Sequence, residues 1–150
     1  FVSKSCRMPL SGNEKTTAKR RIMKLVTTPI LDLGFTLAGG GRTNGTFELS
    51  DDEGNVLVVL LDVPTFDTFY RMAAHWKGPD ETIVGYGLYS LPFECPNHPG
   101  HRRYTFRFHR DAESQQQCAE NIIDWFRDVA VEWFRNKTAG KWTNPNVIRA

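Results

Sequence analysis

The sequence predicts an α+β fold: a four-stranded, mostly antiparallel sheet whose one face is covered by an N-terminal and a C-terminal helix. Two long stretches, one toward each end of the chain, carry apolar residues at intervals of three and four, which is typical of amphipathic helices. Between them lie short segments, bounded by Gly and Pro, in which apolar residues alternate with polar ones or run together, as in strands. Strands that follow one another along the chain favour antiparallel pairing.

The first helix is predicted to begin near residue 13 or 16 and to end at Gly34, where a left-handed residue would cap it. Pro29 removes a backbone donor, so a kink or two shorter helices are expected there. The apolar stripe consists of Ala18, Ile22, Leu25, Val26, Ile30 and Leu33. The three glycines at 39–41 are predicted to form a flexible linker, because a phosphate-binding loop would follow a strand and open a helix.

Residues 46–63 predict a β-hairpin. An alternating strand at 46–50 and a continuous apolar strand at 56–63 flank a polar turn that contains Gly54. After Pro64, which ends the second strand, residues 66–76 carry aromatic and apolar side chains at helical spacing and predict a short helix.

The second half of the chain predicts two more strands and a long helix. The strands span 82–91 and 102–110, the latter with clean alternation. The helix is capped by Asp111 or Ser114 and continues to about residue 136. The predicted organisation is thus a basic arm at 1–12, one domain at 13–136 and a loop-like tail at 137–150.

Length and composition indicate a single globular domain. The chain has 150 residues, of which 40% are hydrophobic and 24% charged. No apolar run reaches the length of a membrane span, so no membrane partner is expected. Three widely spaced cysteines indicate a reducing compartment and therefore a cytoplasmic location. Because the first residue is Phe1 and not Met, we expect a piece of a longer chain.

The charge is unevenly distributed. Residues 1–26 contain seven Lys or Arg and a single acid, Glu14, whereas the remainder is mildly acidic and the whole chain has a net charge of +2. A basic segment of this kind can bind nucleic acid, anionic lipid or an acidic protein. The more common origin of such a segment is the solvated face of an amphipathic helix.

Cys95, His98 and His101 form the most specific candidate for a metal site. Sulfur and imidazole at two-residue gaps are the ligands of a small zinc site, for which His109 or Cys118 would have to supply the fourth ligand. A surface loop shaped by Pro and Gly explains the same residues without metal, and no cofactor is predicted.

Two further arrangements suggest chemistry only weakly. Cys118, near the start of the last helix, would be a nucleophile if the helix dipole lowered its pKa, although a cysteine on an apolar stripe is more often buried. The acidic residues at 51–53, with Asp62, would suit a divalent metal. Neighbouring residues of a hairpin point to opposite faces, so a solvated turn is the better interpretation.

The best candidates for partner binding are Arg103, Arg107 and Trp125. The two arginines share one face of the strand predicted at 102–110, and its aromatic residues occupy the other face, which predicts that the aromatics belong to the core. Trp125 lies off the main stripe of the last helix, where an exposed indole would anchor an interface or fold back over the core. Trp142, in the tail, has the same two interpretations.

The order of these elements resembles that of small bacterial α+β domains that serve as immunity proteins or are uncharacterised. The likeness lies in Leu33, Gly34 and Phe35 at the end of the first helix, the hairpin at 46–63 and residues 126–133 of the last helix. The layout is also similar to that of type III secretion chaperones. Such a resemblance implies a non-enzymatic protein that binds another protein.

Three functions follow as hypotheses. The first is a protein-binding module, either an immunity-type inhibitor or a chaperone-like partner, that is not an enzyme. The second is a nucleic-acid-associated protein that uses the basic N-terminal segment with Arg103 and Arg107. The third is a small zinc-binding or enzymatic domain whose ligands assemble only in the fold.

Overall fold

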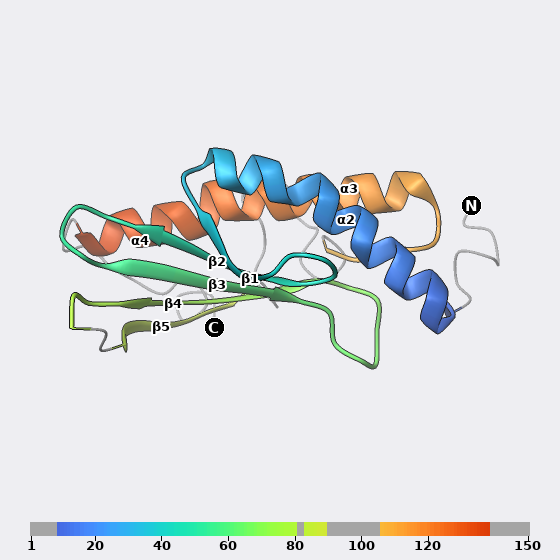
Figure 1. Ribbon diagram of the computed structural model, residues 1–150, viewed down its shortest axis with the longest axis horizontal. Helices are drawn as coiled ribbons and strands as arrows, with labels where there is room; N and C mark the ends of the chain where they lie inside the picture. The colour runs from blue at the N-terminus through green and yellow to red at the C-terminus, as the bar shows by residue number, and fades with distance from the viewer. Residues whose placement is uncertain (1–8, 81–82, 90–105, 139–150) are drawn as a thin grey trace.

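The computed structural model describes residues 9–80, 83–89 and 106–138 and shows the α+β fold that the sequence predicts. A five-stranded antiparallel sheet has the strand order β1-β2-β3-β4-β5, and the helices lie side by side over one face of it (Figure 1). The elements are α2 (Gly12–Asp32), β1 (Thr36–Gly40), β2 (Gly45–Ser50), β3 (Val56–Asp62), β4 (Arg71–Lys77), β5 (Ile83–Tyr89), α3 (Ala112–Trp125), the π-helical turn η1 (Phe126–Ala130) and α4 (Val131–Thr138).

Helix α2 begins at a capping box. The Ser11 side chain accepts a hydrogen bond from the Glu14 N–H (3.1 Å), and the Glu14 carboxylate accepts one from the Ser11 N–H (2.9 Å). As predicted, the helix ends before Gly34, whose φ of 106° requires a residue without a side chain. The break into two shorter helices considered at Pro29 was wrong, because α2 is one helix through that residue. Pro29 lies in the last turn, and the buried Ile30 after it continues the apolar stripe.

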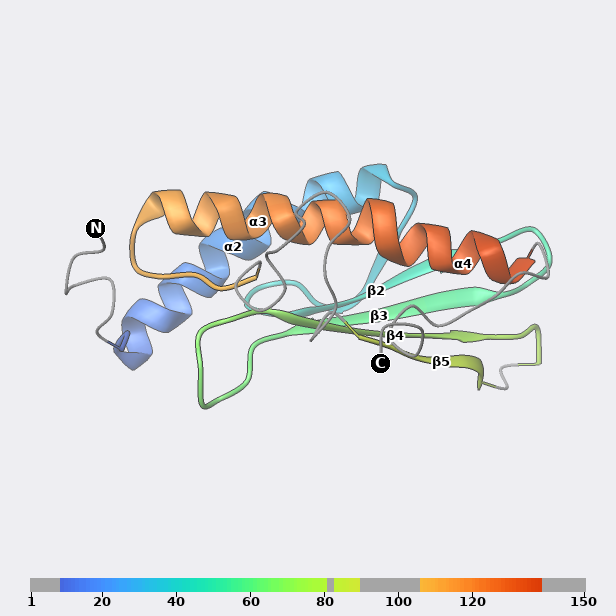
Figure 2. The same ribbon diagram turned by 180° about the vertical axis from the view of Figure 1, so that it is seen from behind.

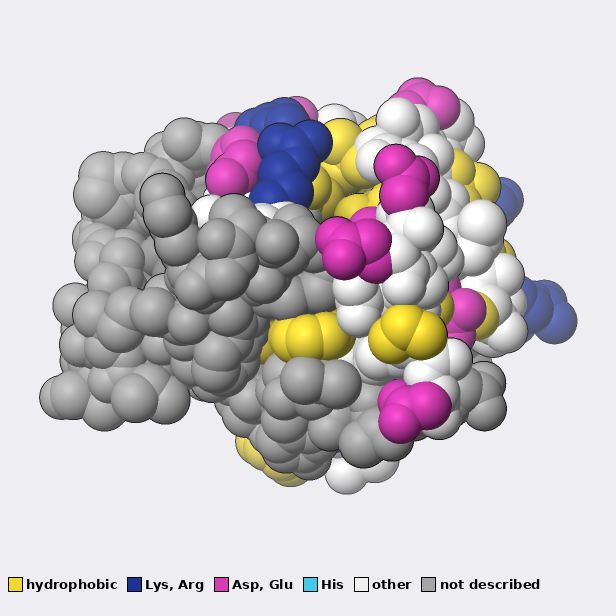
Figure 3. All heavy atoms as spheres, turned by 90° about the vertical axis from the view of Figure 1, so that its left-hand side faces the viewer, with side chains coloured by type: hydrophobic (Ala, Val, Ile, Leu, Met, Phe, Trp, Pro, Cys, Tyr) yellow, Lys and Arg dark blue, Asp and Glu magenta, His cyan; other side chains and the backbone are white. Residues whose placement is uncertain are grey.

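The predicted hairpin is confirmed. Strands β2 and β3 pair from Gly45↔Leu61 to Ser50↔Val56 without interruption. The Asp51 carboxylate closes the turn by accepting hydrogen bonds from the N–H groups of Glu53 and Asn55 (2.9 Å each). Asp52 and Glu53 of this turn are exposed, as expected of a solvated turn. Figure 3 faces the end of the molecule that holds the turn and shows acidic side chains spread over that end.

Two segments differ from the prediction and bring the sheet to five strands. Residues 36–40 form β1, so Gly39 and Gly40 belong to a strand and not to a flexible linker. Residues 71–77 form β4 and not part of a helix. The reason is pairing: β3 is apolar on both faces and is completed on one side by β2 and on the other by β4.

The strand predicted at 102–110 is not present in its described part, residues 106–110. Only Arg107 makes a β-bridge there, an isolated antiparallel bridge to Phe69. Phe106 and Phe108 are nevertheless both buried, as their alternation predicts. The predicted strand at 82–91 is confirmed as β5.

The C-terminal helical segment starts at Asp111, whose carboxylate accepts a hydrogen bond from the Ser114 N–H (2.8 Å). It runs as α3, η1 and α4 along the whole length of the sheet (Figure 2). The core lies between this helical layer and the inner face of β2, β3 and β4. Its largest fully buried members are Trp125, Trp133, Tyr70, Phe47, Phe106, Phe108 and Phe126.

Candidate partner-binding site

The candidate site residues fall into three groups. Arg103, Cys95, His98 and His101 lie outside the described residues. Trp125 is completely buried and packs edge-to-face against Phe126, so the prediction of an exposed anchor was wrong and it belongs to the core. Arg107 is half-buried and lies against the connection between β3 and β4. Of the predicted binding residues, Arg107 alone therefore leads to a described surface.

That connection, residues 64–69, is called here the Phe66 loop. Phe66 is 79% exposed, the highest value among the large hydrophobic residues whose side chains the structure describes. A phenylalanine ring that remains in water forgoes about 2 kcal/mol of burial free energy. A single exposed apolar side chain is common in proteins and does not by itself indicate a binding site. Phe66 differs because the loop that carries it is fixed on both sides.

Arg107 fixes one side of the Phe66 loop. Its guanidinium makes a two-pronged ion pair with the Asp67 carboxylate, at 2.8 and 3.3 Å. The same guanidinium lies 5.7 Å from the centre of the Phe69 ring, within cation–π range. The bonds from Arg107, together with one from the Thr68 N–H, hold the pKa of Asp67 below its usual range. The carboxylate is therefore charged and paired at neutral pH.

Lys15 of α2 fixes the other side. Its ammonium group donates to the carbonyl oxygens of Pro64 (2.9 Å) and Thr65 (3.3 Å), the two residues before Phe66. Partial burial, followed by repulsion from Lys19, lowers the pKa of Lys15. The loop is thus tied to α2 as well as to Arg107.

Backbone hydrogen bonds complete the attachment of the loop. The Phe108 N–H donates to the Thr68 carbonyl (3.1 Å), and the Tyr70 N–H donates to the Phe106 carbonyl (2.9 Å). The Phe66 ring stands edge-to-face to Phe69, with 6.4 Å between ring centres. A loop held on both sides therefore presents an exposed aromatic ring, which is the arrangement of a preorganised contact.

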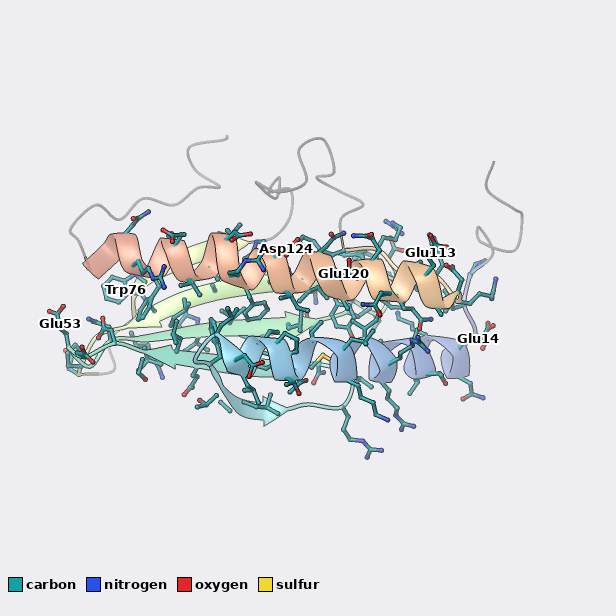
Figure 4. The ribbon with its side chains drawn as sticks, turned by 90° about the horizontal axis from the view of Figure 1, so that it is seen from above. Glu14, Glu53, Trp76, Glu113, Glu120 and Asp124 are labelled. Carbon is teal, nitrogen blue, oxygen red and sulfur yellow. The ribbon has the colours of Figure 1, made fainter. Side chains whose placement is uncertain are left out.

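A second surface is basic. It comprises Arg20, Arg21 and Lys24 of α2 with Arg42 of the β1–β2 turn, and it is called here the basic surface. All four are exposed, and none forms an ion pair with a residue in the described ranges. Seen from above, nitrogen-tipped side chains project from the α2 side, whereas Glu113, Glu120 and Asp124 lie along α3 (Figure 4).

The basic surface and the β1–β2 turn are held together by Tyr70. Its hydroxyl lies 2.9 Å from the Thr43 carbonyl and 3.2 Å from the Lys19 carbonyl. Arg42 is therefore kept beside the middle of α2. By contrast, Arg71, Arg107, Arg110, Arg127 and Arg135 each pair with a carboxylate.

A shallow groove of about 250 Å³ lies between the starts of α2 and α3. Its polar wall is the ion pair between Arg110 and Glu14, with 3.1 Å between Nε and Oε2. The hydrogen bond from Arg110, then the one from Ser11, lowers the pKa of Glu14 from its ordinary value of 4.5 to about 2. Because this pairing occupies both charges, the groove offers neither of them to a ligand.

The lowered pKa of Glu14 predicts a pH-dependent contribution to stability. The contribution is fully present above pH 4.5 and is lost as the pH falls to about 2, because only the folded state holds this carboxylate ionised in that range. We expect Glu14→Gln to be less stable than the parent chain at pH 7 and equally stable near pH 2, as measured by urea unfolding. The matched control is Glu113→Gln, an exposed acid in the first turn of α3. A stability difference for Glu14→Gln that stays constant from pH 7 to 2 would contradict the prediction.

The described residues form neither the cysteine nucleophile nor the metal site that the sequence suggested. The Cys118 thiol is buried beside the Phe106 carbonyl (3.2 Å), and burial raises its pKa, so the activated nucleophile considered from sequence was wrong. Within the described residues, no group of three or more His, Cys, Asp or Glu side chains is placed to hold a metal ion.

The chain matches no protein-family model, no curated protein and no solved structure. None of the helices in the described ranges has the length and apolar character needed to cross a membrane. The class of protein is therefore defined by its fold, an α+β domain with one helical layer on an antiparallel sheet.

Proposed function

We propose that this protein is a non-enzymatic binding module for another protein and that Phe66 is its central contact. The observation that carries the proposal is an aromatic side chain that is 79% exposed on a loop tied by Lys15, Arg107 and two backbone hydrogen bonds. Rigid aromatic residues are enriched among those that dominate interface energetics, because little conformational entropy is lost when they bind.

The rest of the Phe66 loop suits an interface of this kind. Asp67 and Arg107 are charged but already paired, so docking of a partner over Phe66 need not break their ion pair or bury an unpaired charge. The partner expected from this geometry offers an apolar pocket for one ring within a polar rim. The protein would inhibit or escort that partner, as immunity proteins and secretion chaperones do.

The proposal is tested by affinity capture from a lysate of the source cells, carried out both with and without nuclease. We expect the unmodified chain to retain one protein in equal molar amount. Truncation of a central aromatic contact costs about 2 kcal/mol or more, so Phe66→Ala should raise Kd at least about 30-fold. Its unfolding midpoint should not change, because the ring is mostly in water in the unbound fold.

The matched control is Leu31→Ala, which also truncates an exposed apolar side chain, in this case at the end of α2 (39% exposed). It should retain the captured protein. Equal capture by Phe66→Ala and the parent chain would overturn the assignment of Phe66. Loss of every captured protein upon nuclease treatment would overturn the protein-binding function and favour nucleic acid.

A further inference from the structure

Strand β1 is an edge of the sheet that lacks most of the usual protection. Within the described ranges it pairs only with β2, and all five of its residues are exposed. Proteins usually guard such an edge with charged residues, proline or a bulge. The sequence of β1, Thr-Leu-Ala-Gly-Gly, contains neither charge nor proline, and only a bulge at Ala38 interrupts its pairing.

The backbone of this edge is accessible. Gly39 and Gly40 have no side chains to shield their amides, and a Cβ built at Gly39 would meet no atom within 4 Å. Gly40 is needed for the turn that follows, because its φ is 71° and a Cβ there would lie 2.7 Å from the Asn44 carbonyl oxygen. The outer N–H and C=O groups of β1 are therefore open to hydrogen bonding with another extended chain.

Charge differs between the two ends of β1. Near its start, Thr36 pairs with Glu48 of β2, which places an acid beside the strand. Two residues beyond its end stands Arg42, which Tyr70 holds next to α2 and the rest of the basic surface. Figures 1 and 4 place β1 on the same side of the molecule as α2. A chain lying along β1 thus meets positive charge mainly at the Gly40 end.

We propose that β1 is a docking edge for an extended segment of a partner protein that carries acidic residues at one end. The segment adds a sixth strand to the five described. Its backbone bonds to residues 36–40, and its Asp or Glu side chains reach Arg42 and the basic surface of α2. This edge does not include the Phe66 loop, so the proposal does not depend on the function assigned to Phe66.

Two other occupants fit the surface less well. A second copy, pairing antiparallel along β1, would bring to the Gly40 end only the single acid that lies beside its Thr36, Glu48, and would add four cationic side chains of its own, so charge favours it less than an acidic segment. Nucleic acid would find the positive charge but no stacking platform beside it, because the strongly exposed aromatic ring among the side chains that the structure describes is Phe66, in the other loop. An acidic extended segment can both hydrogen-bond to the outer edge of β1 and pair with the cationic side chains of the basic surface.

The experiment uses the full chain as bait for a displayed library of random short peptides and then maps the best binder by amide hydrogen exchange. We expect the selected peptides to be rich in β-branched residues with Asp or Glu gathered at one end. On binding, the amides of residues 36–40 should become protected. Arg42→Glu should raise the Kd of the selected peptide about tenfold or more. Added salt should raise the Kd of the same peptide for the parent chain.

The matched control is Arg135→Glu, which makes the same charge change at an exposed position on α4 and should leave affinity unchanged. Arg42 makes no ion pair with the described residues, so its replacement is not expected to disturb folding. The proposal is overturned if no peptide is selected, if the peptides lack acidic residues, or if they bind without protecting residues 36–40. It is also overturned if β1 becomes protected only in a dimer or upon addition of a single-stranded oligonucleotide.

Discussion

Replacement of Phe126 by alanine is expected to lower the free energy of unfolding by about 3–5 kcal/mol. Phe126 is fully buried where the helical layer meets the sheet. Its ring packs edge-to-face against Phe35 and Phe47, with ring centres 5.3 and 5.5 Å apart. Truncation removes these contacts and leaves a cavity that the surrounding elements fill only in part. Because a domain is stable by only about 5–15 kcal/mol, the loss is a large fraction of the total.

The measurement is urea unfolding at 25 °C, monitored by circular dichroism. The matched control is Leu60→Ala, which truncates a side chain that is 46% exposed on β3 and should cost well below the core value, at about 1 kcal/mol or less. If Phe126→Ala cost no more than this control, the π-helical turn η1 would not pack on Phe35 and Phe47 as described.

The second large effect is expected at Tyr70. Its ring is fully buried beside Phe108, and its hydroxyl joins the β1–β2 turn to α2. Tyr70→Phe keeps the ring but leaves the Thr43 carbonyl without this donor, at a cost of about 1–3 kcal/mol. Tyr70→Ala also creates a cavity and should cost about 3–5 kcal/mol.

Urea unfolding of both variants separates the contribution of the hydroxyl to stability from that of the ring. Burial raises the pKa of Tyr70, so the hydroxyl remains a donor and the cost of Tyr70→Phe should not change between neutral and mildly alkaline pH. Amide exchange should show faster opening of residues 41–44 in Tyr70→Phe. Equal stability of Tyr70→Phe and the parent chain would mean that the hydroxyl does not hold the turn.

Local signals in the sequence predicted much of the fold. Gly34 marks the end of α2, Asp111 marks the start of α3, and the polar turn at 51–55 marks the hairpin. Each of these signals acts through contacts with residues close in sequence. The apolar stripe of α2 crosses Pro29 unbroken. In that case the burial of Ile30 outweighed the missing backbone hydrogen bond near the helix end.

The segment at 66–76 shows where local pattern is insufficient. Its apolar residues fit helical spacing, but Tyr70, Met72 and Ala74 also alternate, and it is these that are buried. Pairing with β3 selects the strand, and this choice leaves Phe66 in an exposed loop. The candidate site was therefore missed because the sequence placed Phe66 on a helix face.

The predicted binding residues also show which properties the sequence reveals and which depend on tertiary contacts. Arginine at 107 and tryptophan at 125 are visible in the sequence, but their environments are not. Asp67, forty residues earlier, pairs with Arg107, and Trp125 is fully buried in the core.

The sequence by itself determined the fold class, the helical layer, the hairpin and the basic character of the first helix, because each depends on spacing or on neighbours within a few residues. Only the tertiary structure decided that residues 36–40 and 71–77 are strands, that Phe66 is exposed on a tied loop, and that the basic surface is unpaired within the described chain. Those outcomes depend on contacts between residues distant in sequence, and spacing along the chain does not encode them.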